Sequence, residues 1–488
     1  MDGPHCAGCR QRDAIIAELR ARIVVLEQLL AEQAKRLVEQ DRRLVEQDRR
    51  LAELEARLKI NSSNSSLPPS ANPPSAPKPP AKPPTGRKPG GQPGHPGHSR
   101  PRLPADAIVP HVPSHCERCQ SPLAAEASPG EPEPTWHQVA ELPDVLAVVT
   151  EHRGHARTCS HCGHVTWGTI PADVLAHGFG PKLTATIAFL SGRCHGSKRT
   201  IEELVGTLFG VPMSLGSVSN AEAEMSAALE QPYGQAEAAV RAATVKNADE
   251  TGWALAGKLC WMWMAVSAGV ALFKICLGRG HAALAELLGT SVHGTVGSDR
   301  WTAYGIIDLF HRQVCWAHLK RDFQKWVDWG RESLPIGRAG LEAVQQLFAV
   351  WRDFRAGVLD RPGLAAALEP VSQNLHAALE AGLSCPNKKA ARFCRNVLGV
   401  YPALWTFARV AGVEPTNNVA ERTLRLAVIW RKISFGNHSE GGCRFVERIL
   451  TTVQTLRLQN RQVLAYLRDA VFAHRAGRPA PVLVPIGA

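Results

Sequence analysis

A seven-residue apolar repeat constrains the first part of the chain more than any other feature. Residues 13–60 contain no glycine or proline, and aliphatic residues recur at every seventh position: Ile16, Ile23, Leu30, Leu37, Leu44, Leu51 and Leu58. This period is typical of helices that wind around a partner in a left-handed coiled coil. We therefore predict a leucine-zipper-like coiled coil over 13–60, about 70 Å long, and a homodimer or higher oligomer. The alternative is a single solvated helix.

Composition restricts the class of protein. Lys and Arg total 56 against 44 Asp and Glu, a net charge of +12 over 488 residues. This surplus suits a polyanionic partner such as nucleic acid, although solubility alone would also explain it. No apolar run has the roughly 18 residues of a membrane helix, and the first residues lack the apolar core of a signal peptide. We expect a soluble intracellular protein that is not associated with a membrane.

The segment 61–105 is rich in proline. Residues 61–66 (NSSNSS) end the predicted helix, and residues 67–104 carry six cations and no acidic residue: Lys78, Lys82, Arg87, Lys88, Arg100 and Arg102. Such a composition keeps a chain extended and cannot build a core. We predict a basic linker, which either follows a DNA backbone or groove or is a plain spacer.

Cysteine pairs indicate a metal site in 106–170. Two Cys-x-x-Cys pairs lie 39 residues apart: Cys116, Cys119, Cys159 and Cys162. Two such pairs complete a tetrahedral zinc shell, and thirteen cysteines in a large chain fit a reducing cytosol better than a disulfide framework. We predict structural Zn²⁺, with a hairpin from residues 136–153 carrying the second pair. Redox chemistry is the alternative, and three histidines are alternative ligands: His115, His161 and His164. The pair Cys6 and Cys9 stays unassigned.

Residues 171–243 have a helical pattern. An apolar helix (IEELVGTLF) is followed by a Gly-Val-Pro turn at 210–212, and Ser214 can cap a second helix. This order is typical of a helix-turn-helix DNA-binding domain. The second helix offers few basic side chains, so an ordinary helical hairpin is the alternative.

From residue 244 the pattern changes to strands. The runs ATVKNADETGWAL, KLCWMWMAV and VALFKICL are followed by a helix at 281–288, a strand ending GTVGSDRW, and a later strand RQVCWAHL. This order predicts a mixed α/β sheet rather than a doubly wound one. Asp249 and Asp299 fall at strand ends within it. A carboxylate leaving a buried strand is costly unless it is paired or binds a metal, so we identify both as candidate metal ligands.

A third acid lies in EPTNNVAERTLRLAVIWRK (414–432). Glu421 sits on the predicted helix, and cations follow it: Arg422, Arg425, Arg431 and Lys432. The simple interpretation is a surface pair between Glu421 and Arg425. The functional one is a carboxylate that completes a Mg²⁺ site with Asp249 and Asp299, followed by residues that hold phosphates. Two Mg²⁺ or Mn²⁺ ions in such a site activate an oxygen nucleophile and stabilise the leaving oxygen in phosphoryl transfer.

These motifs together resemble those of a known family. NSSNSS-x-PPS, GGQPGH, both Cys-x-x-Cys pairs, DETGW, SDRW-x-AY, CWAHLKRDF, EPTNN-x-AER-x-LR and WRK-x-SFG occur in the order seen in transposases of the IS66 insertion-sequence family. The resemblance covers nearly the whole chain. It implies a multidomain α/β protein with an RNase H-like catalytic core at 244–435, a helical insertion at about 325–410, and a helical region at 436–488. It also implies that the acidic triad of a DDE transposase is Asp249, Asp299 and Glu421.

We therefore expect Mg²⁺-dependent DNA cleavage and strand transfer at the terminal inverted repeats of an insertion sequence. The partners would be double-stranded DNA, a second protomer and accessory proteins of the same element. Six clustered cations and a histidine are expected to hold the DNA backbone: His318, Lys320, Arg321, Arg422, Arg425, Arg431 and Lys432. The alternatives are a nuclease that cuts without joining and an inactive zinc-dependent DNA-binding regulator.

Overall fold

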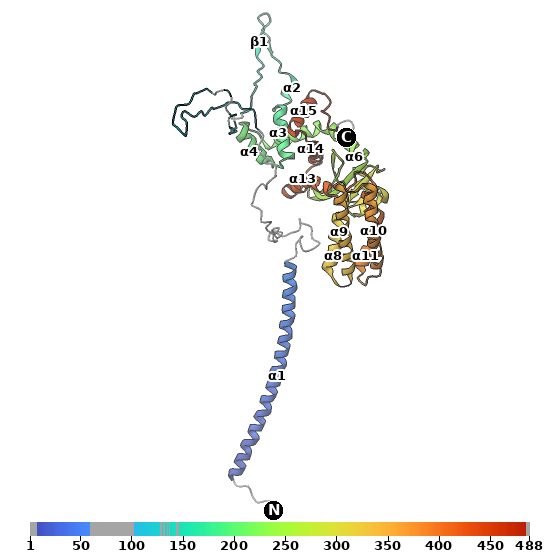
Figure 1. Ribbon diagram of the computed structural model, residues 1–488. Helices are drawn as coiled ribbons and strands as arrows, with labels where there is room; N and C mark the ends of the chain where they lie inside the picture. The colour runs from blue at the N-terminus through green and yellow to red at the C-terminus, as the bar shows by residue number, and fades with distance from the viewer. Residues whose placement is uncertain are drawn as a thin grey trace, which may run out of the picture. The chain divides into compact units, whose positions relative to one another are not determined.

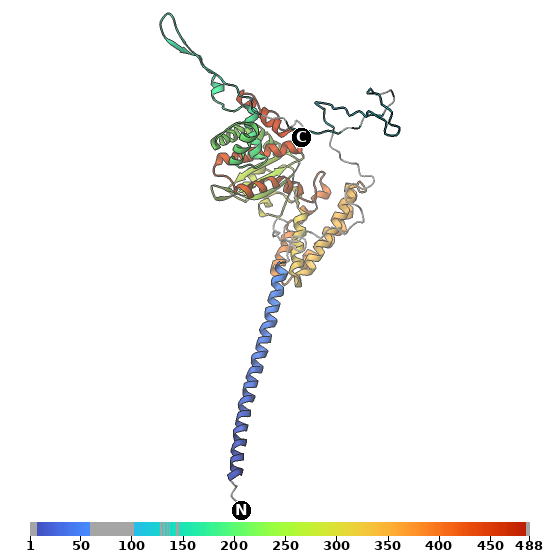
Figure 2. The ribbon, with the colours of Figure 1, turned by 90° about the vertical axis from the view of Figure 1, so that its left-hand side faces the viewer.

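The computed structural model describes residues 7–58 and 102–484, apart from 127–128, 130–131, 134, 136 and 143–145. It begins with one continuous helix, α1 (Ala7–Leu58), which both views show as a long rod (Figures 1 and 2). The prediction of a helix over 13–60 is therefore confirmed as far as Leu58. The repeat positions from Ile16 to Leu51 are exposed, for example Leu30 by 66% and Leu37 by 60%, as a seam without a partner chain would be. Pairing of two chains stays a prediction, and the linker predicted at 61–105 lies almost wholly outside the described residues.

The second cysteine pair is carried by a short antiparallel hairpin of β1 (Ala156–Thr158) and β2 (Val165–Trp167). We expected that hairpin at 136–153, and this prediction is wrong, because the described residues of that stretch form no strand. The strands instead flank the pair directly, so that Cys159 and Cys162 occupy the turn between them. None of the described helices is both long and apolar enough to cross a membrane.

Five helices follow, as the sequence predicts for 171–243: α2 (Ala172–Leu175), α3 (Pro181–Gly192), α4 (Lys198–Phe209), α5 (Leu215–Ala228) and α6 (Glu230–Ala242). Helix α4 ends at Gly210, whose φ is 66°, and the Ser214 hydroxyl caps α5 by accepting from the Ser217 N–H. Helix α5 contains no Lys or Arg, and its Glu222 and Glu224 pair with Lys198 and Arg475. These contacts support the ordinary helical hairpin over a DNA-recognition helix.

The chain then forms a five-stranded mixed sheet in the order β5-β4-β3-β6-β7. Its elements are β3 (Val245–Leu255), β4 (Lys258–Val266), β5 (Ala271–Cys276), α7 (His281–Leu288), β6 (Thr295–Ser298) and β7 (Arg312–Val314). Strands β3, β4 and β5 are antiparallel neighbours, whereas β3, β6 and β7 run parallel. The predicted order of strands and helix is confirmed, and this mixed sheet is consistent with an RNase H-like core.

The last predicted strand, RQVCWAHL, is only partly confirmed. Strand β7 ends at Val314, and helix α8 (Trp316–Trp329) begins two residues later. The prediction was wrong for the second half because Trp316, Leu319 and Phe323 are all fully buried at the spacing of one helix face. Helices fill the expected insertion: α9 (Leu334–Arg355), α10 (Arg361–Gly382), α11 (Lys388–Leu398) and α12 (Thr406–Arg409).

Three helices end the described chain: α13 (Asn418–Ser434), α14 (Glu440–Leu458) and α15 (Val463–Arg475). Helix α14 lies along the edge strand β5 and binds its outward N–H groups through side chains. Glu447 accepts from Ile275 at 2.6 Å, Thr451 from Phe273 at 2.9 Å and Thr455 from Ala271 at 3.1 Å. The accepting side chains are four residues apart on α14, a rise of about 6 Å. The donating N–H groups are two residues apart on β5, a rise of about 6.7 Å, so each side chain lies opposite one N–H group.

The described chain divides into two compact units. One contains α9, α11 and most of α8 and α10, together with α1. The other contains the sheet, α2–α7, α12–α15 and the cysteine pairs. All three predicted catalytic carboxylates belong to the unit that contains the sheet.

Candidate active site

Two of the predicted carboxylates sit side by side on parallel strands. We expected both at strand ends, which is correct for Asp299, directly after the last residue of β6, and wrong for Asp249, which is in the middle of β3 because the strand continues to Leu255. The register pairs Asn247 with Gly297, so each aspartate stands two residues beyond this pair on strands about 4.8 Å apart. Alternation along β3 places Asn247, Asp249 and Thr251 on one face. Both Asn247 and Thr251 contact α13 or its cap, so Asp249 lies on the face that α13 covers.

Helix α13 supplies the third carboxylate, and a buried asparagine fixes its start. Asn417 is 1% exposed. Its side-chain NH₂ donates to the Ala248 carbonyl at 2.8 Å, its side-chain oxygen accepts from Asn247, and its backbone N–H donates to Cys315 Sγ at 3.1 Å. The Glu421 N–H then donates to the Asn417 carbonyl at 3.1 Å, so the first turn of α13 is tied to β3 beside Asp249.

The three acids act on one another without meeting: their ligand atoms do not all lie within 4.8 Å of one another. Burial is the main cause that raises the pKa of Asp249 to about 8, and the charges of Glu250, Asp299 and Glu421 contribute. A proton is therefore held in a cluster of carboxylates that would repel one another if all were ionised. A divalent cation would replace that proton and remove the repulsion. Three carboxylates are the hard oxygen donors that Mg²⁺ or Mn²⁺ prefers, so the residues present fit the expected ions.

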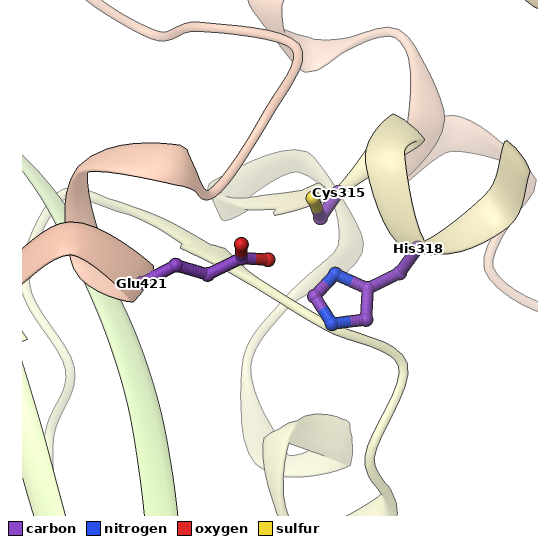
Figure 3. Close-up of side chains that lie close together, drawn as sticks. All are labelled: Cys315, His318 and Glu421. Atoms are coloured by element: carbon purple, nitrogen blue, oxygen red, sulfur yellow. The ribbon is translucent and has the colours of Figure 1, made fainter. Parts of the chain in front are cut away.

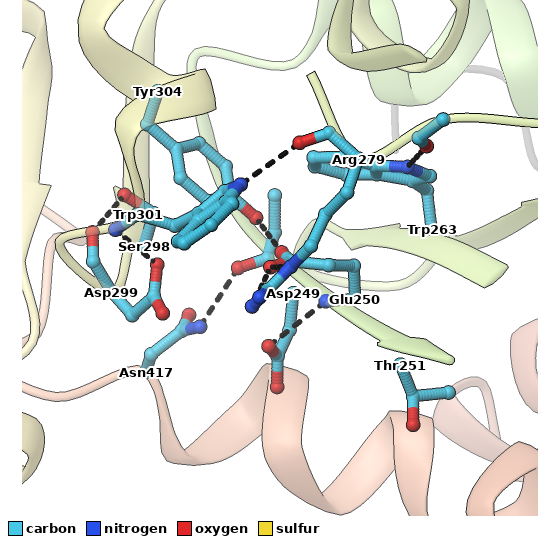
Figure 4. Close-up of polar contacts among 12 residues, drawn as sticks. Asp249, Glu250, Thr251, Trp263, Arg279, Ser298, Asp299, Trp301, Tyr304 and Asn417 are labelled. Atoms are coloured by element: carbon cyan, nitrogen blue, oxygen red, sulfur yellow. Dashed lines mark hydrogen bonds and ion pairs between the residues drawn. The ribbon is translucent and has the colours of Figure 1, made fainter. Parts of the chain in front are cut away.

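The remaining contacts of Asp299 hold its loop. The Trp301 N–H donates to its Oδ1 at 2.8 Å, and Arg312 donates from Nη2 to its backbone carbonyl at 2.9 Å. Arg312 is itself only 2% exposed. The loop that leaves β6 is thus fixed by its own Trp301 (Figure 4) and by a buried guanidinium on the neighbouring strand β7, and these contacts orient the second carboxylate relative to the first.

Sequence reasoning missed Glu250, which occupies the opposite face of β3. Its side chain is 1% exposed and binds Arg279 at 2.7 Å and the Tyr304 hydroxyl at 2.8 Å (Figure 4). Burial raises the pKa of Glu250, and the neighbouring Asp299 adds to this effect. Two consecutive acids in a strand must face opposite sides. The DET motif therefore already required a cation or a donor behind the sheet, and this was the available signal.

Arg279 connects this buried pair to the Asp299 loop. Its guanidinium lies 3.9 Å from the Trp301 ring centroid and 4.5 Å from that of Trp261. The Trp301 indole N–H donates to the Arg279 carbonyl at 2.8 Å. Because Trp301 also donates to Asp299, the Glu250–Arg279 pair supports the carboxylate on the other side of the sheet. We regard Glu250 and Arg279 as positioning residues.

The predicted DNA-contacting cations are placed differently from one another. Arg422, Arg425 and Lys432 are exposed on α13, and none of them pairs with an acid in the part of the chain that the structure describes. Arg431 instead donates from Nη1 to Thr251 Oγ1 at 2.9 Å and to the Gly252 carbonyl at 3.0 Å. Arg431 therefore holds α13 to β3 with that nitrogen.

The basic cluster predicted at the end of a strand belongs to a helix. His318, Lys320 and Arg321 lie in the first two turns of α8. Cys315, which directly precedes α8, and Glu421 on α13 lie close together (Figure 3).

The four predicted zinc ligands form two local turns. In one, the Gln120 N–H donates to the Cys116 carbonyl and the Cys116 N–H to Ser121; in the other, the Gly163 N–H donates to the Cys159 carbonyl. Hydrogen bonds with Ser121, and then one with Cys116, lower the pKa of Cys119. Hydrogen bonds with Cys162 and His161 lower the pKa of Cys159. Among the described residues, no group of three or more ligand atoms includes these thiols. Zinc binding stays a prediction.

Comparison with known proteins agrees with this arrangement. Residues 177–444, more than half of the 488 residues, match the family described as "Transposase IS66 family". Residues 9–101 match a second family, described only as a family of unknown function (DUF6444). A curated relative is the uncharacterized protein y4qI of Sinorhizobium fredii (strain NBRC 101917 / NGR234), 26% identical over 220 residues, which are 42% of this chain and 40% of that protein. This chain thus spans about two fifths of the length of that relative.

Proposed function

Because the chain belongs to the IS66 family of transposases, we propose that it is a metal-dependent DNA strand-transfer enzyme that acts on the terminal inverted repeats of its own insertion sequence. It would cut at the ends of the element and join the freed 3′-hydroxyls to target DNA. A nuclease would cut the DNA in the same way but would not join its ends to a target.

One observation carries the proposal. Burial is the main cause that raises the pKa of Asp249 on β3 to about 8, and the charges of the carboxylates at the end of β6 and on α13 add to its effect. Such crowding is unfavourable for folding, and is expected where a cation is to be bound. In the mechanism, Asp249, Asp299 and Glu421 would hold two Mg²⁺ ions. When bound, these ions would activate the attacking oxygen and stabilise the leaving one.

The residues of the chain itself supply orientation and binding. Asn417 sets the start of α13 against β3, and Arg312 and Trp301 hold the Asp299 loop. Arg422 and Arg425 follow Glu421 on the exposed side of α13, where they would bind phosphates near the site of cleavage without reading bases. The helix α1 would pair protomers so that two element ends are brought together, and the zinc region would add DNA contacts.

The test is Asp299→Asn, which removes one charge from the site and keeps the shape of the side chain. The variant should bind a duplex of the element end as the wild type does and should neither cut nor join it in Mg²⁺. The control is Asp173→Asn, because Asp173 is an exposed acid on α2. Normal joining by Asp299→Asn would reject the triad. Cutting without joining by the wild type would favour the nuclease, and DNA binding without any Mg²⁺-dependent cleavage would favour the regulator.

A further inference from the structure

An aromatic side chain is held out in solvent where α13 ends. Phe435 is 83% exposed, and its backbone adopts the left-handed conformation, with φ 58° and ψ 17°. Its N–H donates to the Arg431 carbonyl and closes the helix. This position normally favours glycine, because a side chain makes the conformation costly. The chain nevertheless places a phenylalanine there, and a strained backbone at an exposed apolar residue suggests a function.

The next two residues fix Phe435 rigidly to the sheet. The Asn437 N–H donates to the Ala254 carbonyl at 2.8 Å, and the Asn437 carbonyl accepts from Ala256 at 2.7 Å. The Trp253 indole N–H donates to Asn437 Oδ1 at 2.9 Å. A Cβ on Gly436 would lie 2.3 Å from the Ala254 carbonyl oxygen, so only glycine fits between them. The exposed ring therefore projects from a backbone that is held on both sides.

The exposed face of α13 leads from the catalytic carboxylates to this ring. The five exposed residues that follow Glu421 on this helix form what we call the α13 stripe: Arg422, Arg425, Ile429, Lys432 and Ile433. At 3.6 residues per turn they fall within about 100° of arc, and Glu421 borders that arc. Phe435 comes fourteen residues after Glu421, which is about 20 Å along the helix, or about six base steps of duplex DNA.

The composition of the stripe indicates what covers it. It combines three cations with two apolar side chains, of which Ile433, two residues before Phe435, is 56% exposed. The centre of a protein–protein interface is depleted in charge, whereas DNA presents phosphates for the cations and base faces for an apolar ring. The continuity of this stripe with Glu421 favours DNA as the occupant.

We propose that Phe435, supported by Ile433, inserts as an apolar wedge against the bases of the bound DNA and unstacks one base step about six positions from the site of cleavage. This inference rests on the proposed function, because it takes the bound DNA as its substrate. The wedge would bend the duplex and direct its end toward the three carboxylates. Stacking on the ring is tolerant of sequence, so the wedge would select an easily unstacked step rather than a particular base.

The experiment uses the full chain with Asp299→Asn, which keeps the DNA uncut, and a duplex carrying one terminal inverted repeat and its flank. 2-Aminopurine is placed at successive positions of this duplex, since its fluorescence rises when it is unstacked. We expect a rise at one or two adjacent positions, lost in Phe435→Ala and kept in Phe435→Trp. Affinity should fall roughly 5- to 100-fold in Phe435→Ala, the equivalent of about 1–3 kcal/mol. The matched control is Phe472→Ala on α15, because Phe472 is 56% exposed.

A second measurement separates this role from a structural one. With Asp299 restored, Phe435→Ala should cleave the paired duplex slowly and regain most of its rate on a duplex mismatched at the responsive step. A change in the DNA cannot repair a misfolded variant. Fluorescence that is unchanged at every position while wild-type cleavage proceeds would overturn the wedge alone. A Phe435→Ala variant whose only defect is a changed oligomeric state would assign the ring to contact between copies and also overturn it. Absence of any DNA binding by the wild type would instead refute the proposed function.

Discussion

Replacing Asp249 by asparagine should stabilise the metal-free protein, although it removes a predicted catalytic residue. Burial and the neighbouring acids raise the pKa of this carboxyl from its ordinary value of 3.8 to about 8. Above pH 3.8 the unfolded chain releases the proton while the folded chain keeps it, so folding becomes less favourable as the pH rises. The loss of stability is complete near pH 8, because Asp249 also ionises in the folded chain at that pH. Asparagine has the same shape and carries no charge, so the variant escapes the cost.

The magnitude follows from the size of the pKa change. Each pH unit in that window costs about 1.4 kcal/mol, so the whole shift corresponds to roughly 6 kcal/mol at pH 8. Entry of water and relaxation of neighbouring side chains reduce such penalties in real proteins. We therefore expect Asp249→Asn to exceed the wild type by about 2–3 kcal/mol at pH 8 and by about zero near pH 4.

The assay is urea denaturation without metal between pH 4 and pH 8, followed by the fluorescence of the buried Trp253 and Trp263. Mg²⁺ should then stabilise the wild type at pH 8 by mass action and leave Asp249→Asn unchanged, which reverses or narrows the difference. The exposed Asp173 provides a control, since its replacement by asparagine should change stability by less than about 0.5 kcal/mol at every pH. A stability difference that does not grow with pH, or a wild type that is more stable than Asp249→Asn at pH 8 without metal, would refute the crowding of carboxylates.

Three further outcomes are expected. Glu250→Gln removes the charge that pairs with Arg279 and should lower the free energy of unfolding by about 1–3 kcal/mol. It should also raise the Mg²⁺ concentration needed for half-maximal cleavage. An unchanged Mg²⁺ requirement would exclude the positioning role of Glu250. Thr451→Val removes the acceptor for the Phe273 N–H and should destabilise the protein by about 1–3 kcal/mol, measured by urea denaturation, whereas Thr451→Ser should retain most of the stability. Protein purified without chelators should contain about one Zn²⁺ per chain by metal analysis, and Cys159→Ser should lose it; a wild type without zinc would reject the metal site.

The sheet was largely predictable from the sequence, because alternation and runs of β-branched and aromatic residues directly reflect burial in strands. The predicted runs agree with β3, β4 and β5 to within two residues. The error at RQVCWAHL has a clear cause. The first three residues pair with β6, and the apolar residues that follow keep the period of a helix, so a continuous apolar run conceals the change of structure at Cys315.

The three carboxylates of the site could be predicted from the sequence, whereas the residues that hold them in position could not. Asp249, Asp299 and Glu421 could be named because an acid within or directly after an apolar strand, or within a resemblance, is visible residue by residue. Asn417 could not be assigned its role, because its partners Ala248 and Cys315 lie far away along the chain. The same applies to Arg431, which looks like a phosphate ligand in sequence and is directed to β3 by packing.

The match between α14 and β5 has a consequence for how copies of this protein can associate. An open edge strand is a template for another chain and a common origin of aggregation. Here Ala271, Phe273 and Ile275 have no N–H left to offer a neighbour, because side chains of the same molecule occupy them. Two protomers therefore cannot join by extending the sheet through this edge. Association is left to surfaces such as α1, and loss of a single hydroxyl on α14 would free only one of the three N–H groups.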